Sequence, residues 1–135
     1  MSQPIIALAA LAGLLAAGSA RAEIAVITNV NNPATRMFTE QAAQFFLGQS
    51  NAFTPIDQTP DTAIRTEFYK KAANKTLVQV SAIWSRIAFS GKGMPPKEFR
   101  SNAEVKKAVA EDPKAIAYID KSAVDDTVKV LLVIP

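Results

Sequence analysis

The residues best suited to chemistry lie in one loop and in the start of the helix that follows it. Gln58, Thr59 and Thr62 carry amide and hydroxyl donors, and Arg65 carries a guanidinium that can hold an oxyanion through two parallel hydrogen bonds. A helix N-terminus adds unpaired backbone N–H groups and a partial positive charge. The spacing therefore predicts an anion site formed by Gln58, Thr59, Thr62 and Arg65.

Ordinary helix capping is the competing explanation for the same residues. Asp61 is a favoured N-cap residue, and in that position it would occupy the helix amides and repel an anion. Thr62 can serve as the cap as well, and Arg65 is then a solvated surface charge. Both explanations stay open at the level of sequence.

Three other segments offer weaker chemistry. Asn29, Asn31 and Asn32 follow the first predicted strand, where α/β folds place ligands, but asparagines in a turn mostly shape the backbone. Ser90–Lys92 can form a backbone nest for an anion, although a Gly-Lys-Gly sequence is more often a mobile loop. Asp125-Asp126 lacks the number of oxygen ligands that calcium needs. We therefore expect no metal site.

The absence of two residue types narrows the function further. The chain contains no histidine and no cysteine, which removes thiolate chemistry, most zinc chemistry and any imidazole base. No Asp/Glu or Ser/Lys pair stands out as a substitute. We therefore expect no catalytic residues and no cofactor, and we predict that the protein is not an enzyme.

The first 22 of the 135 residues have the layout of a secretory signal peptide. An apolar run at Ile5–Ala17 is too short to span a bilayer, and Ala20-Arg21-Ala22 provides a cleavage site. Cleavage leaves residues 23–135 as a single domain in the periplasm and lowers the net charge from +3 to +2, because Arg21 is removed. So balanced a charge does not indicate nucleic-acid binding. Contact with a membrane is expected only through an uncleaved signal segment.

Hydrophobic periodicity predicts an α/β domain with a mixed sheet flanked by helices. Strands are expected at Glu23–Thr28, Ala52–Ile56, Ala115–Ile119 and Val128–Ile134, and helices from Thr39 to Gly48, from Thr62 to Ala73, around Leu77–Ile87 and at Ala103–Glu111. Phe38, Ala42, Phe45 and Phe46 form an expected core stripe. Gly48 is expected as a left-handed C-cap, and Pro55 indicates that its strand lies near an edge of the sheet.

Five fragments of the chain occur in the order of a known family. They are VNNPATRMFTEQAAQFFLGQ, IRTEFY, IWSRIAFSGKGMPP, AEVKKAV and AIAYIDKSAVDDTVKVL. Together they resemble a group of secreted proteins that are similar to one lobe of the type 2 periplasmic solute-binding fold, in its phosphate-receptor branch. The resemblance implies capture of a solute between two lobes for delivery to an ABC transporter, and this chain has room for one lobe.

The resemblance also places this chain's residues on the family's anion motif. The phosphate receptors carry a Ser-Gly-Thr step at the helix start, and Thr62-Ala63-Ile64 stands at that place here. Thr62 keeps a hydroxyl, whereas Ala63 lacks the flexibility of glycine and Ile64 has no side-chain donor. The family's Gly-Ala-Ile-Gly-Tyr strand is matched by Lys114–Tyr118.

These features predict a periplasmic solute-binding-like module for phosphate or another small oxyanion. The alternative is a non-transport interaction protein of the periplasm that kept the fold and lost the ligand. We also expect a homodimer or a periplasmic protein partner, because a single lobe exposes the surface that would face a second one. The Val128–Ile134 run can pair with another chain if it is an edge strand, whereas a monomer would hold it inside its own sheet.

Overall fold

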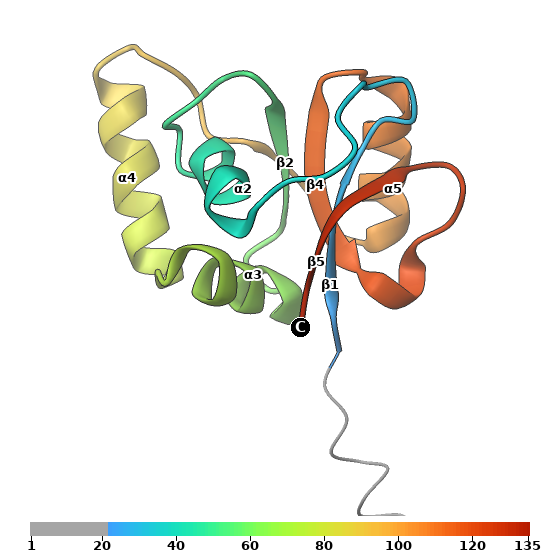
Figure 1. Cartoon of the computed structure of the whole chain (residues 1–135). Coiled ribbons are helices and arrows are strands. Elements are labelled where there is room, and N and C mark those ends of the chain that lie inside the picture. The colour runs from blue at the N-terminus through green and yellow to red at the C-terminus, as the bar shows by residue number, and fades with distance from the viewer. Residues whose placement is uncertain (1–21) are drawn as a thin grey trace, which may run out of the picture.

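The computed structural model describes residues 22–135, so that the predicted signal segment lies outside the described residues except for Ala22. A five-stranded mixed sheet has the order β3-β2-β4-β1-β5 (Figure 1). Its strands are β1 (Ile24–Thr28), β2 (Thr54–Gln58), β3 (Lys97–Phe99), β4 (Ala115–Asp120) and β5 (Lys129–Ile134). β1 is antiparallel to β4 and to β5, whereas β2 is parallel to β3 and β4. The expected α/β class and mixed sheet are confirmed.

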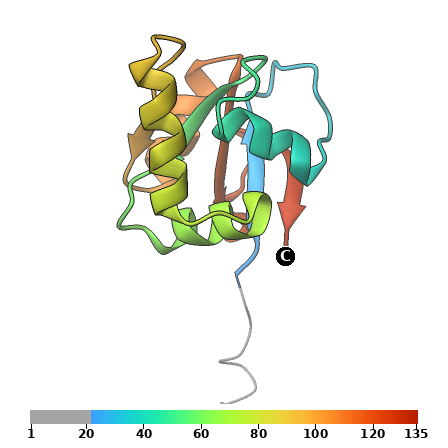
Figure 2. The same cartoon turned by 90° about the vertical axis from the view of Figure 1, so that its left-hand side faces the viewer.

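The helices lie on both faces of this sheet. They are α2 (Thr39–Phe46), α3 (Ala63–Ala73), α4 (Leu77–Phe89) and α5 (Asn102–Glu111). The helices α2, α3 and α4 lie on one face and α5 lies on the other, and α4 is the outermost helix of its face (Figures 1 and 2). In the part of the chain that the structure describes, no helix is long and apolar enough to cross a membrane.

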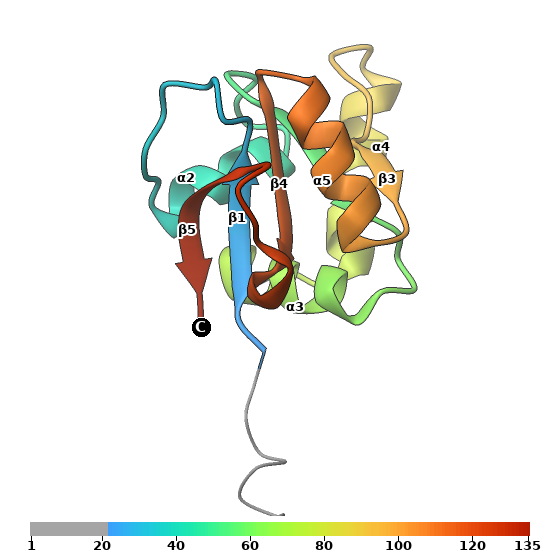
Figure 3. The ribbon, with the colours of Figure 1, turned by 90° about the vertical axis from the view of Figure 1, so that its right-hand side faces the viewer.

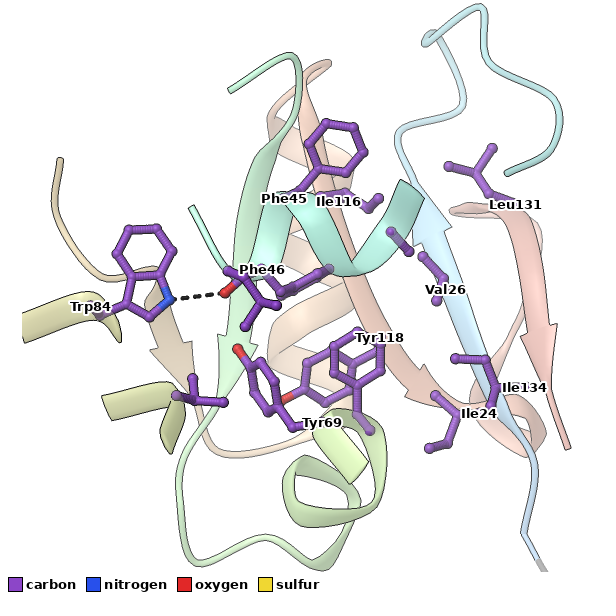
Figure 4. Packing of buried hydrophobic residues seen from close by; sticks show 14 residues of the cluster. Ile24, Val26, Phe45, Phe46, Tyr69, Trp84, Ile116, Tyr118, Leu131 and Ile134 are labelled. Carbon is purple, nitrogen blue, oxygen red and sulfur yellow. Dashed lines mark hydrogen bonds between the residues drawn. The ribbon is translucent and has the colours of Figure 1, made fainter. Parts of the chain in front are cut away.

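Alternation along the two central strands divides the core into two halves. Val26 and Tyr118 point towards α2, α3 and α4, and Ala25 and Ala117 point towards α5. Every residue of β1 is buried, because helices cover both faces of the sheet. In the larger half the ring of Trp84 reaches the end of α2, where its Nε1 donates to the Phe46 carbonyl at 2.9 Å (Figure 4).

The start of α2 corrects one sequence expectation. Phe38 was expected on the core stripe, but its side chain is 71% exposed, whereas Ala42, Phe45 and Phe46 are buried as expected. Phe38 is the residue before the helix, with an extended backbone, so it leaves the 3.6-residue periodicity. Its N–H donates to Oε1 of Gln41 at 2.9 Å, which closes the first turn without a capping hydroxyl.

The second strand is shifted towards the C-terminus relative to the prediction. It covers Thr54–Gln58 instead of Ala52–Ile56, and it lies between β3 and β4. Pro55 is tolerated because β2 pairs with β4 only at Thr54 and Pro55, and with β3 only from Ile56 onward. The proline thus lies where the ladder changes sides, and β2 lies next to the edge strand β3, near an edge as expected.

The last strand is an edge strand that a loop partly covers. β5 pairs only with β1 in the described residues, and a register shift interrupts the pairing between Val26 and Ile27. On its outer side the Met37 N–H donates to the Leu131 carbonyl at 3.0 Å, and the Lys129 ammonium donates to the Asn32 carbonyl. The loop before α2 runs beside β5 in Figure 3. The predicted homodimer therefore has only part of this edge available, and it stays a prediction.

The end of α2 depends on a glycine, as expected. Gly48 has a φ of +73°, and a Cβ at this position would lie 2.4 Å from Cδ1 of Ile87 and 3.1 Å from Cη2 of Trp84. Left-handed backbone disfavours a side chain here, and the end of the Ile87 side chain would have to shift to make room for one. Gly91 has a similar φ of +76°, but a Cβ there would meet nothing within 4 Å.

These two glycines allow a controlled stability experiment. We expect Gly48→Ala to lower the free energy of unfolding by about 2–4 kcal/mol, because it adds overlap with Ile87 to the cost of left-handed backbone. Gly91→Ala carries only the backbone cost and is expected to lose about 1–2 kcal/mol. Urea denaturation of residues 23–135 measures both values. Equal losses in the two variants would contradict the close contact between α2 and α4.

Candidate functional site

Gln58 ends β2 and ties three elements together. It is 2% exposed, and its Nε2 donates to the Tyr118 carbonyl and to Oδ1 of Asn102, both at 3.1 Å. A glutamine at the end of a strand satisfies buried polar groups on β4 and at the start of α5. The side-chain amide of Gln58, predicted as a donor to the anion, therefore donates to protein acceptors instead, although Gln58 lines the pocket described below.

The turn before α3 leaves the helix start without a side-chain cap. The N–H and the hydroxyl of Thr62 both donate to the Thr59 carbonyl, at 3.0 and 2.8 Å. Thr62 is the N-cap residue, yet its side chain accepts no hydrogen bond from the helix, and the first turn holds no acidic residue. Asp61, which sequence reasoning favoured as the cap, is exposed and lies outside the helix. The leading amides of α3 are thus free of a side-chain acceptor.

Thr59 supports this turn through its carbonyl oxygen. Its hydroxyl is buried and has no well-aligned hydrogen-bond partner, although its interaction with Asp61 is the main reason why the pKa of that carboxyl lies below the ordinary value. The buried hydroxyl of Thr59, predicted as an anion donor, does not line the pocket beside Thr62.

Arg65 points away from that pocket into a buried ionic cluster. Its Nη1 donates to the Gln58 carbonyl at 2.9 Å and to Oε2 of Glu98 at 2.6 Å, and it lies 3.7 Å from Oδ2 of Asp57. The residue is only 9% exposed, so the predicted alternative of a solvated surface charge was wrong. Thr62 and Arg65 therefore line different pockets, and the structure does not bring the two side chains together in one site.

The centre of this cluster is a carboxylate that sequence reasoning did not find. The hydroxyl of Tyr69 donates to Oδ2 of Asp57 at 2.6 Å, and that of Tyr118 donates to Oδ1. Burial raises the pKa of Asp57 above its ordinary value, while Arg65 and the two tyrosines oppose that shift. Burial also raises the pKa of both tyrosines, so they remain protonated donors. Figure 4 shows the two tyrosine rings side by side in the core.

A pocket of about 390 Å³ opens between the starts of α3 and α5. Gln58, Thr62, Ala63 and Ile64 line it from β2 and α3, and the other lining residues are Ala22, Glu67, Arg100, Ser101, Asn102 and Asp120. These walls lie at the carboxyl ends of β2 and β4, the edge at which α/β sheets bind ligands.

The electrostatics of this pocket are mixed. The free amides of α3 and the exposed Arg100 attract an anion, whereas Asp120 and Glu67 repel it. The Asp120 carboxylate accepts from Nδ2 of Asn102 at 2.7 Å, which spreads part of its charge onto α5. The start of α5 is closed, because Oγ of Ser101 accepts from the Glu104 N–H at 3.2 Å. Free amide donors are therefore concentrated on α3.

The weaker candidates have structural roles or remain surface loops. Nδ2 of Asn29 donates to the Val109 and Ala110 carbonyls, and its Oδ1 accepts from the Asn31 N–H, so this side chain closes the end of α5. The Asn32 side chain likewise bonds to backbone at Pro113 and Ala34. Among residues 22–135 no group of three or more acidic residues is arranged to hold a metal ion.

Comparison with known proteins gives a likeness in fold. No family model matches the chain, and no curated protein matches it. The chain is similar to an ABC-type phosphate transport receptor from Vibrio cholerae, with a TM-score of 0.64 and 18% identity over 82% of this chain and 45% of the receptor.

Two further solved structures give the same result. One is a putative phosphate ABC transporter substrate-binding protein with bound phosphate from Clostridium perfringens, at a TM-score of 0.64 and 20% identity, covering 82% of this chain and 44% of that chain. The other is PstS from Borrelia burgdorferi, at 0.61 and 15%, covering 82% and 46%. The chain thus spans less than half the length of the structures that it matches. Its fold is that of one lobe of a periplasmic-binding-protein-like fold.

The Asp57 cluster generates a stability prediction. We expect Tyr69→Phe and Tyr118→Phe each to lower the free energy of unfolding by about 1.5–3 kcal/mol, because each leaves a buried carboxylate with one donor fewer. Thr127→Val is the matched control, since it removes a hydroxyl that donates to the exposed Asp125 at 2.5 Å. The control is expected to lose less than about 1 kcal/mol. Denaturant titration measures all three, and losses as small as the control in both tyrosine variants would contradict the buried cluster.

Proposed function

We propose that this protein is a periplasmic solute-binding-like module that holds a small oxyanion, with phosphate as the first candidate. The observation that carries the proposal is the uncapped start of α3, which opens onto a pocket at the carboxyl ends of β2 and β4. The likeness in fold to phosphate receptors supports it, and one of those structures holds bound phosphate.

The proposed contacts come from backbone amides at the start of α3 and from the exposed Arg100, and not from the buried guanidinium of Arg65. The amides of Ala63 and Ile64 provide donors, and Arg100 provides positive charge from the other wall. Arg65 does not line this pocket, and its hydrogen bond to the Gln58 carbonyl fixes the end of β2. Binding rather than catalysis is proposed, because histidine and cysteine are absent from the chain.

The affinity of this site is expected to be low. One lobe leaves the anion open to water, and the carboxylates of Asp120 and Glu67 line the same pocket. We expect a dissociation constant on the order of 0.1–1 mM for phosphate. The largest contribution is expected from hydrogen bonds that the unpaired amides at the start of α3 donate to the anion. These amides are available because no side chain accepts from them.

A capping substitution tests this site directly. Thr62→Asp places a carboxylate on the free amides, so we expect phosphate affinity to fall by at least about tenfold while the helix keeps or gains stability. Arg100→Ala is expected to weaken binding about threefold, and Arg86→Ala on α4 is the matched control that leaves it unchanged. Calorimetry with phosphate and sulfate measures these affinities.

Two results would contradict the proposal. One is equal phosphate affinity in the wild-type protein and in Thr62→Asp, which would place the anion elsewhere. The other is the absence of heat with any oxyanion up to high millimolar concentration in a folded wild-type protein. That second result would favour the non-transport interaction protein of the periplasm instead.

Export is a separate part of the proposal. The apolar Ile5–Ala17 run and the Ala20-Arg21-Ala22 step support cleavage after Ala22. We expect protein recovered from the periplasm to begin at Glu23, which intact-mass measurement determines to the residue. Recovery of the full chain from the membrane fraction would contradict cleavage and support an N-terminal anchor.

A further inference from the structure

A second and larger cavity lies at the opposite end of the sheet from the anion pocket. Its volume is about 610 Å³, within the range of small-molecule sites, about 300–1,000 Å³. It is lined by the loop that precedes β2, by the first residues of β2, by the segment between α4 and β3, and by the last turn of α5. The anion pocket is lined instead by the end of β2 and by the helix starts, so the two sites are separate.

The inner walls of this cavity are aromatic. Phe45 and Phe53 pack edge to face with ring centroids 5.0 Å apart, and Trp84 and Phe99 also line the cavity. The hydrogen bond from Nε1 of Trp84 to the Phe46 carbonyl satisfies the polar atom of the indole and fixes the ring. Aromatic rings with no unpaired polar group favour a flat apolar body.

Four charged side chains also line the cavity, two of each sign. Lys92 and Lys97 come from the loop after α4 and from β3, and Glu111 and Asp112 come from the end of α5. Within residues 22–135, none of the four forms an ion pair, although the Asp112 carboxylate accepts from the Lys114 N–H at 2.9 Å. The cavity therefore presents ammonium and carboxylate groups from different elements beside one apolar interior.

We propose that this cavity binds a small zwitterion with an apolar body, of the kind represented by an aromatic amino acid. The rings of Phe45, Phe53 and Trp84 receive the apolar body. Lys92 and Lys97 attract the ligand's carboxylate, and Glu111 attracts its ammonium. This proposal is independent of oxyanion binding at the start of α3.

Trp84 makes the proposal directly measurable. It is the only tryptophan of the chain, and its ring lines the cavity, so its fluorescence reports occupancy. Three probes share a phenyl body and differ in charge: L-phenylalanine, 3-phenylpropionate and 2-phenylethylamine. We expect L-phenylalanine to shift the Trp84 emission with a dissociation constant on the order of 1 mM, and each singly charged analogue to bind at least about fivefold more weakly.

Matched variants locate the binding site. Ala108 lines the cavity and Ala110 is exposed on the same helix, so Ala108→Phe is expected to weaken binding at least about tenfold while Ala110→Phe leaves it unchanged. Glu111→Gln and Lys97→Gln change exposed side chains and keep the cavity volume. Each substitution is expected to weaken the binding of L-phenylalanine. Glu111→Gln is expected to leave the binding of 3-phenylpropionate unchanged, because that probe has no ammonium, and Lys97→Gln is expected to leave the binding of 2-phenylethylamine unchanged, because that probe has no carboxylate.

Three results would overturn the proposal. The first is no change in Trp84 emission with L-phenylalanine up to 50-fold above the expected constant, on the order of 50 mM. The second is equal binding of the three probes, which would reduce the site to nonspecific apolar contact. The third is binding that Glu111→Gln and Lys97→Gln both leave unchanged in folded protein.

Discussion

The structure depends on the burial of one carboxylate. Asp57 lies within the sheet, 2% exposed, and is held by two tyrosine hydroxyls and by a nearby guanidinium. A buried charge without such partners is costly, so the positions of β2, β4 and α3 are coupled through it. Tyr118 comes from β4 and Tyr69 from α3, and Arg65 joins the same helix to β3 through Glu98. The helix is thereby fixed on the sheet by polar geometry as well as by apolar packing.

That cluster also decides what the surface can offer to a ligand. Because Arg65 neutralises buried acid, the guanidinium is unavailable to the pocket beside Thr62. What remains at the start of α3 is backbone, with a hydroxyl that turns back onto the Thr59 carbonyl. The proposed anion site therefore relies on amide geometry and the helix dipole, and the acidic side chains nearby lower its expected affinity.

Local patterns in the sequence predict the elements better than they predict the site. Strands β1, β4 and β5 and all four helices were found to within one or two residues, because each carries a clear hydrophobic period or a capping signal. The three-residue β3 was missed, since Lys97–Phe99 has no period of its own and pairs only with β2. The Asp57 cluster joins residues 12 and 61 positions apart, and no local pattern encodes such a contact. The role of Arg65 was missed for the same reason, since its partner Glu98 lies 33 residues away.

The position of β1 sets the order in which this domain can fold. The first strand lies between the last two, so that Ile24 pairs with Asp120 on one side and with Ile134 on the other. Both of these partner strands come from the C-terminal part of the chain, and closing such long loops precedes any gain from pairing. The centre of the sheet therefore forms only when β4 and β5 are present, and until then the apolar residues of β1 have no sheet partner. A chain that is synthesised from its N-terminus therefore needs protection from aggregation until nearly its whole length is available for cooperative folding.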